Sequence, residues 1–182
     1  MQIFKLMSAL LDYPSDELRV ELENEIRKAG GSLALLNEID PACLLGRDSH
    51  PEIAYVIDYL LQNELTVVQA NYVQTFDLTP EHSLHLTHHI FGEEKTRGPA
   101  LIDLTEYLKS YGYAHDEKEL PDFLPLMLEF AAELSVDEAR VFIGDTSKIL
   151  GVIAENLEKS ASPYARLLTI LNQFGSLMKL AA

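Results

Sequence analysis

The stretch SVDEARVFIGDTSKILGVIAENLE, residues 135–158, contains the clearest helix signal in the chain. Ser135 and Glu138 have the spacing of a capping box, in which the two side chains accept hydrogen bonds from backbone N–H groups at a helix N-terminus. We therefore expect the whole stretch to form one helix. The pair Ser162-Pro163 then predicts the start of a last helix, because proline suits a first helical turn.

The N-terminal third has the same helical periodicity. Residues 3–11 carry apolar side chains at steps of three and four, which predicts one amphipathic helix. Ser15 is a good N-cap for a second helix, and Gly30-Gly31 is a good end for it. Residues 32–48 suggest a short helix and a loop, and His50-Pro51 begins a further strong helix.

The middle of the chain continues the pattern with short breaks. Residues 65–76 are expected to form one helix despite their β-branched side chains, because apolar residues recur every four positions. Further helices are expected over residues 83–91 and 98–112. We find no strand alternation of useful length and no internal repeat. The prediction is an all-α fold, a single globular multi-helix domain of about eight or more helices over residues 1–182.

The composition excludes some functions and favours others. There are 14 Lys and Arg against 29 Asp and Glu among 182 residues, a formal charge of −15, and 47% of the residues are hydrophobic. This is typical of a folded protein and argues against binding to nucleic acid, which requires clustered basic side chains. An acidic excess suits a basic partner, although solubility alone also explains it.

Compartment signals are consistent with a cytoplasmic protein. The single cysteine, Cys43, cannot form an internal disulfide or a cysteine-based zinc site. The first residues lack the features of a secretory signal, and no apolar stretch approaches the ~20 residues of a membrane helix. We expect a cytoplasmic protein with no direct membrane insertion.

The histidines and the cysteine raise the question of a metal site or a catalytic centre. His82, His85 and His89 would share one face of a helix, a spacing that binds zinc, nickel or copper. No second element offers the remaining ligands, so hydrogen-bonding histidines on a polar face are favoured instead. No nucleophile elbow, metalloprotease motif or phosphate-binding glycine loop is present, and Cys43 is typical of a small buried apolar residue. The sequence therefore indicates no enzyme and no resident cofactor or metal.

The segment ELPDFLPLMLEF, residues 119–130, is the most informative for function. Pro121 suits the first turn of a helix. On that helix Asp122, Glu129 and Glu133 would form one stripe, because they are spaced by seven and four, next to an apolar stripe. Such a helix would pack its apolar side in the core and direct carboxylates at a groove, or simply present a solvated face.

With these motifs the sequence resembles a known family, the NarJ-like branch of the redox-enzyme chaperones, which is related to the TorD and DmsD chaperones. The resemblance spans nearly the whole chain. Its motifs are Leu10-Leu-Asp-Tyr-Pro14, Tyr72-Val-Gln-Thr-Phe-Asp77, Ser83-Leu-x-Leu86 with His89, Gly92-Glu93, Arg97-Gly-x-Ala100, Glu119-Leu-Pro-Asp-x-Leu-Pro-Leu126, Leu128-Glu129-Phe130 and Ser162-Pro-Tyr-Ala165.

The resemblance implies a TorD-like helical chaperone that is not an enzyme. Its partner would be the catalytic subunit of a molybdoenzyme such as nitrate reductase, held by a basic N-terminal segment until the molybdenum cofactor is inserted. Cofactor-delivery proteins are further candidate partners. By analogy, the expected peptide-binding residues are Asp122, Glu129 and Glu119 on the rim, with Tyr72, Phe76, Leu124 and Leu128 in the groove or core. We expect Arg97 and His89 to be structural anchors, Arg97 through a bidentate pair with the acidic helix.

The chain departs from the family pattern at one position. Many relatives have histidine after the Pro-Asp pair, whereas this chain has Phe123, so a pH switch at that position is excluded.

Three further interpretations of the function stay open. In the first, the client is another molybdoenzyme of the same superfamily, since the motifs do not distinguish these enzymes. In the second, the chain is a general acidic adaptor that binds unrelated basic peptides with similar affinity. In the third, it is a metal-binding or catalytic protein that uses the histidine cluster.

Overall fold

The computed structural model describes residues 1–92, 95–114 and 119–176, and ten α-helices lie within these ranges. They are α1 (Gln2–Leu11), α2 (Asp16–Ala29), α3 (Ser32–Ile39), α4 (Ser49–Gln62), α5 (Leu65–Tyr72), α6 (His88–Phe91), α7 (Arg97–Ser110), α8 (Leu124–Glu133), α9 (Val136–Lys159) and α10 (Ala165–Ser176). A π-helical turn, Val73–Asp77, and a 3-10 turn, Pro80–His82, follow α5. The predicted all-helical fold is confirmed for these residues.

Several helix ends follow the local signals. The Ser15 hydroxyl accepts a hydrogen bond from the Leu18 N–H, and Gly30 ends α2 in the left-handed conformation at φ 89°. Ser135 and Glu138 form the capping box of α9. These ends are predictable because each involves only groups within one or two helical turns.

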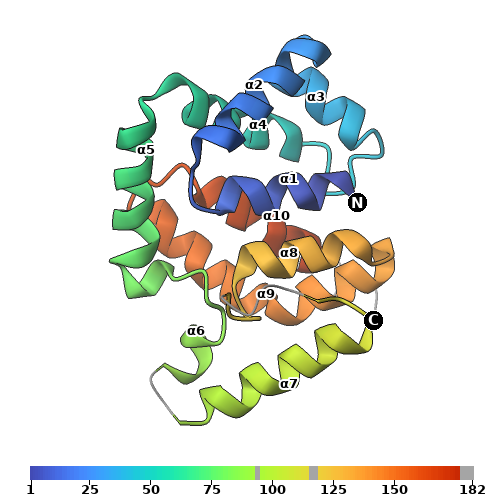
Figure 1. The fold of residues 1–182 in the computed structure, drawn as a ribbon, viewed down its shortest axis with the longest axis vertical. Coiled ribbons are helices and arrows are strands. Elements are labelled where there is room, and N and C mark those ends of the chain that lie inside the picture. Colours follow the sequence, from blue (N-terminus) through green and yellow to red (C-terminus); the bar gives the residue numbers. More distant parts are fainter. Residues whose placement is uncertain (93–94, 115–118, 177–182) are drawn as a thin grey trace.

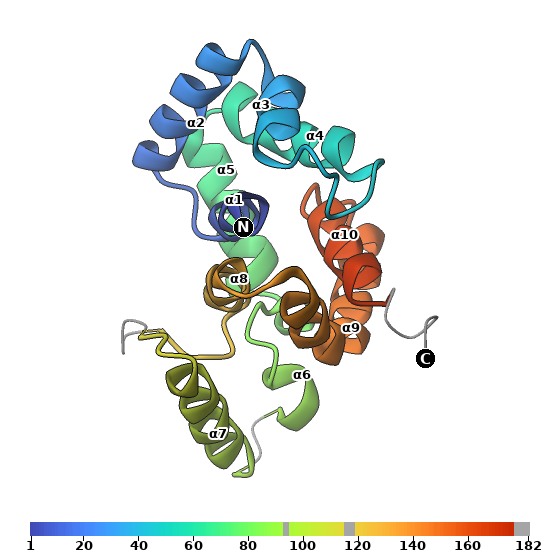
Figure 2. The same cartoon turned by 90° about the vertical axis from the view of Figure 1, so that its right-hand side faces the viewer.

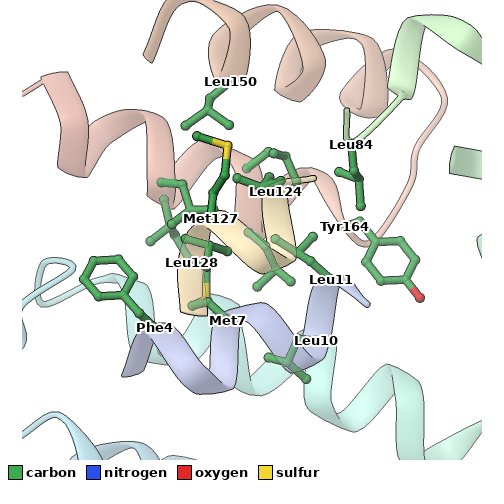
Figure 3. Packing of buried hydrophobic residues seen from close by; sticks show 14 of the residues in the cluster. Phe4, Met7, Leu10, Leu11, Leu84, Leu124, Met127, Leu128, Leu150 and Tyr164 are labelled. Carbon is green, nitrogen blue, oxygen red and sulfur yellow. The ribbon is translucent and has the colours of Figure 1, made fainter. Parts of the chain in front are cut away.

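The core is built around α1 and α8, which pack against each other, and around the long antiparallel pair α9 and α10. Figure 3 shows Met7 and Leu11 of α1 directed towards Leu124 and Leu128 of α8, with Leu150 of α9 on the far side. These side chains are fully or almost fully buried.

The structure is elongated (Figure 1). Helices α2, α3 and α4 lie at one end, α1 and α8 to α10 lie in the middle, and α6 and α7 form the other end (Figures 1 and 2). Within the described residues, none of the helices has the length and apolar character needed to span a membrane.

Two predicted elements were wrong in detail. Residues 83–91 do not form one helix: only His88–Phe91 is helical, and His85 pairs with Phe123 in an isolated antiparallel bridge. The Leu86 N–H donates to the Asp122 carbonyl at 3.0 Å, and the Leu124 N–H donates to the Leu84 carbonyl at 2.9 Å. This pairing keeps residues 122–123 extended, so α8 begins at Leu124, with Pro125 rather than Pro121 in its first turn.

A pair of glycines sets the distance between α9 and α10. A Cβ atom added at Gly175 would lie 2.9 Å from the Gly144 Cα atom, whereas one added at Gly98 in α7 meets nothing within 4 Å. Small residues at this crossing therefore allow the two backbones to touch.

We predict that Gly175→Ala lowers the free energy of unfolding by about 1–3 kcal/mol, because backbone atoms cannot yield to the added methyl group. The melting temperature should fall by roughly 3–9 °C. Gly98→Ala is the matched control, and it should leave the melting temperature unchanged or raise it slightly. Equal melting temperatures for both variants would show that the contact between α9 and α10 accommodates the added methyl group.

Candidate functional site

An acidic groove runs beside α8, with a volume of about 250 Å³. Its apolar part is formed by Phe123, Pro125 and Leu126, where the chain enters α8. Carboxylates lie around it, on residues Asp12, Glu119 and Glu129, and Tyr113 closes one side. The groove thus joins the end of α1, the segment after α7 and the start of α8.

Contacts between α1 and α8 in the core fix the position of the groove. The Ser8 hydroxyl of α1 donates a buried hydrogen bond to the Pro125 carbonyl at 2.8 Å, which fixes α1 against the first turn of α8. Asp12 directly follows α1 and accepts a hydrogen bond from the Tyr13 N–H at 2.7 Å. The position of Asp12 on the rim is therefore set by the contact between α1 and α8.

The rim carboxylates differ in their partners. The Tyr113 hydroxyl donates to Glu129 at 3.2 Å, and burial together with the Glu129 charge raises the pKa of Tyr113 to about 12. Asp12, Glu119 and Glu129 have no cationic partner within 4 Å among the described residues, whereas Glu133 pairs with Lys5 at 2.8 Å. Three carboxylates beside an apolar floor are suited to a peptide with both basic and apolar side chains.

Asp122 is not on this rim, which corrects the expected acidic stripe. It precedes α8, and its exposed fraction is 0%. Its Oδ2 atom accepts hydrogen bonds from the Thr87 N–H at 3.0 Å and from the Thr87 hydroxyl, and His85 Nδ1 lies 3.3 Å from Oδ1. Asp122 therefore joins the 85–87 loop to the start of α8 and is covered from solvent.

Arg97, in the first turn of α7, completes this network. Its Nη2 atom lies 3.4 Å from Asp122 Oδ2, and its Nε atom donates to the Thr87 hydroxyl at 2.9 Å. The contact with Asp122 thus uses one nitrogen, where we expected a bidentate pair. We call Asp122, Thr87, His85 and Arg97 the Asp122 network.

The network determines the ionisation of its carboxylate. Burial alone would raise the pKa of Asp122, but the hydrogen bonds from His85 and Thr87 and the charge of His85 lower it to about 2. The carboxylate is therefore ionised at neutral pH and satisfied by its donors, as a buried charge must be.

The remaining residues expected in the groove lie in the core. Leu124 and Leu128 are fully buried, and Tyr72 and Phe76 pack with Tyr164 in a cluster of aromatic rings. The Tyr72 hydroxyl donates to the Leu11 carbonyl at 3.0 Å, which places it beneath the groove. In this conformation these four residues support the groove and do not line it.

The histidines are separated by their hydrogen bonds. His82 bonds the Thr75 carbonyl, His85 bonds Asp122, and the Nε2 atom of His89 lies 2.8 Å from the Ser83 carbonyl. No group of three His, Cys, Asp or Glu residues in the described ranges is arranged to hold a metal ion. Cys43 is only half-buried and lies in a turn at φ 49°, so it is not the buried apolar residue we expected.

Six residues that line the groove were not expected there from the sequence: Asp12, Tyr113, Ala114, Phe123, Pro125 and Leu126. One sequence feature could have identified Asp12, namely its place in the Leu10–Pro14 motif, whereas no sequence feature pointed to Tyr113. Glu93, part of the family motifs, lies outside the described residues.

Comparison with known proteins gives consistent results. Residues 47–169 match the model of a family described as the nitrate reductase delta subunit. The chain is 33% identical over 168 residues to the probable nitrate reductase molybdenum cofactor assembly chaperone NarJ of Bacillus subtilis, covering 92% of this chain and 85% of that protein. It is 31% identical over 166 residues to NarJ of Escherichia coli K12, covering 91% of this chain and 66% of that one. It is 31% identical to the probable chaperone NarW of the same organism, covering 95% and 68%. These relatives are assembly chaperones and not enzymes.

We predict that Asp122→Asn lowers the free energy of unfolding by about 3 kcal/mol at pH 7, because Arg97 and His85 would then face a neutral amide. A carboxylate with a lowered pKa stabilises the fold above its unfolded pKa near 3.8 and loses this effect as the pH falls through about 2. The difference between wild type and variant should therefore shrink between pH 4 and pH 2, as the pH falls through the window from 3.8 to about 2. Urea unfolding at several pH values measures it.

The exposed Asp103 of α7 gives the control variant, Asp103→Asn, which should unfold like wild type. Ordinary surface substitutions change the free energy of unfolding by less than about 0.5 kcal/mol. A decrease this small for Asp122→Asn would mean that the Asp122 network contributes little to stability.

Proposed function

Because the chain belongs to the nitrate reductase delta subunit family, we propose that it is a cytoplasmic chaperone for the assembly of a nitrate reductase. It binds the basic N-terminal segment of the catalytic subunit and holds that subunit until the molybdenum cofactor is inserted. The chain itself carries no cofactor in this proposal, and cofactor-delivery proteins are further candidate partners. The family match confirms the resemblance noted in the sequence.

The acidic groove is the observation that carries this proposal. A basic, amphipathic segment needs an apolar surface for its bulky side chains and carboxylates for its Lys and Arg residues. Phe123 and Leu126 offer the first, and Asp12, Glu119 and Glu129 offer the second. The net charge of −15 adds long-range attraction and so favours fast association with a basic partner.

The rim carboxylates have different parts in this binding. Asp12 and Glu119 have no cationic partner within 4 Å among the residues that the structure describes, so they can pair with cations of the segment directly. Glu129 first has to exchange the Tyr113 hydroxyl for a guanidinium or ammonium group, which is a stronger hydrogen-bond donor to a carboxylate. Asp122 has an indirect part, because its network fixes the chain segment that carries Phe123.

Two competing interpretations predict different binding. A chaperone for another molybdoenzyme would use the same groove with a different client segment. A general acidic adaptor would use any acidic surface, and α2 offers one: Asp16, Glu17, Glu21 and Glu25 line an open groove along its outer side. That surface has Val20 as its single apolar residue, so it suits basic side chains without apolar anchors.

We predict that Glu119→Gln combined with Glu129→Gln weakens binding of the N-terminal peptide of the nitrate reductase catalytic subunit about tenfold or more. Each exposed pair contributes ~0.2–1 kcal/mol, partial desolvation adds to this, and ~1.4 kcal/mol is a factor of ten. Isothermal titration calorimetry at low and moderate salt measures the effect, which should be larger at low salt. Both residues are exposed, so the variant should fold like wild type.

The matched control is Glu17→Gln combined with Glu21→Gln, which removes two exposed carboxylates from α2. It should bind the peptide within about twofold of wild type. An equal loss in both double variants would favour the general acidic adaptor. If Glu119→Gln combined with Glu129→Gln binds the peptide with wild-type affinity, the peptide-binding site has to be sought elsewhere, first around residues 72–77.

A further inference from the structure

A second groove, with a volume of about 310 Å³, lies between α6, α7, α8 and α9. Unlike the acidic groove, its lining is mainly apolar: Leu86, Ile90, Leu104, Met127, Phe142 and Ile149 contribute, together with Tyr107 and Val141. Its size is at the lower end of the ~300–1,000 Å³ range of ligand pockets. A groove of this size takes a few bulky side chains.

The two grooves lie on different sides of α8. Leu126 and Glu129 line the acidic groove, whereas Met127 lines the second one, and successive residues of a helix point about 100° apart. A segment bound in one groove therefore does not fill the other.

Part of the second groove is exposed apolar surface. Ile90 of α6 is 61% exposed and Val141 of α9 is 47% exposed. Besides the buried Leu108, α7 meets the core through tyrosine rings: Tyr107 stacks on Phe142 at 6.0 Å, and Tyr111, directly after the helix, lies edge-on to Phe130 at 5.5 Å. Rings at this distance keep α7 from closing onto α9.

The charged residues that line the second groove are all acidic. The lining contains two carboxylates and no basic residue. Asp122 is satisfied by its own network, but Asp145 is exposed and has no cation within 4 Å among the described residues. Apolar walls with one uncompensated carboxylate at the edge complement an amphipathic helix that carries a Lys or Arg beside its apolar face.

We propose that the groove between α7 and α9 is a second docking site, for a partner helix with two bulky apolar side chains about one turn apart and a Lys or Arg placed to meet Asp145. This site is separate from the groove assigned to the N-terminal segment of the client, and its test does not depend on that assignment.

The probe is a synthetic amphipathic peptide of about 14 residues, with two leucines four positions apart and one lysine on the same face. A twin peptide has glutamate in place of the lysine. Fluorescence anisotropy with the full chain should show about fivefold tighter binding of the lysine peptide, equivalent to one charge pair. Asp145→Asn should reduce this preference by most of its size, leaving only the effect of the chain's net charge, and Glu155→Gln, which removes an exposed carboxylate elsewhere on α9, should leave the preference unchanged.

The apolar walls are tested by a matched pair of double variants. Ile90→Ser with Val141→Ser should weaken the lysine peptide about tenfold. Ile102→Ser with Val152→Ser changes residues of the same types that are 63% and 51% exposed but line neither groove, and it should bind within about twofold of wild type. All four positions are exposed, so folding should be retained, as circular dichroism checks.

Four results would overturn the proposal. They are no binding of the lysine peptide, equal losses in the two double variants, a preference for lysine that is the same in Asp145→Asn as in Glu155→Gln, and displacement of the probe by the N-terminal peptide of the client. The last result would place the probe in the acidic groove. Failure of the client peptide to bind the wild-type chain would instead affect only the proposed chaperone function.

Discussion

The buried carboxylate of Asp122 is the interaction on which this end of the molecule depends. It gathers donors from the 85–87 loop and from the first turn of α7, next to the backbone pairing that positions the start of α8. Leu84, Leu86 and Leu124, which flank this network, also belong to the hydrophobic core. A charge that is removed from water must have its hydrogen bonds satisfied, so one residue fixes three segments at once. The chain around the start of α8 lines both grooves, and Leu86 and Thr87 also line the second one.

The sequence predicted the fold well where the determining signals are local. Ser15, Gly30 and Ser135 set helix ends through groups within a turn or two, and the structure has those ends. The prediction failed at Pro121 and Pro125, since either proline suits a first turn. The choice between them is made by the bridge to residues 84–86, a tertiary contact that no local pattern reveals.

The same reasoning explains which site residues were predictable. Glu119 and Glu129 follow from an acidic block that flanks an apolar one, and the structure places both on the groove rim. Asp122 was assigned to the rim because a helical register was assumed, and it is buried because that register begins two residues later. Tyr113 and Asp12 reach the groove from distant segments, so their roles depend on packing between helices.

The weak attachment of α7 has a consequence for local unfolding. Leu108 is the one fully buried side chain among the residues of this helix, and its further contacts include the partly buried Leu104, the Tyr107 ring and the bonds of Arg97 to Asp122 and Thr87. Segments with so few buried contacts open at a lower free energy than the whole fold does. Backbone amides of α7 should therefore exchange hydrogen sooner than those of α9. Because Tyr113 bounds one groove and Tyr107 the other, an opening of α7 removes a wall from both grooves. A ligand in either groove therefore favours the closed helix and strengthens binding in the other groove, which is the opposite of displacement.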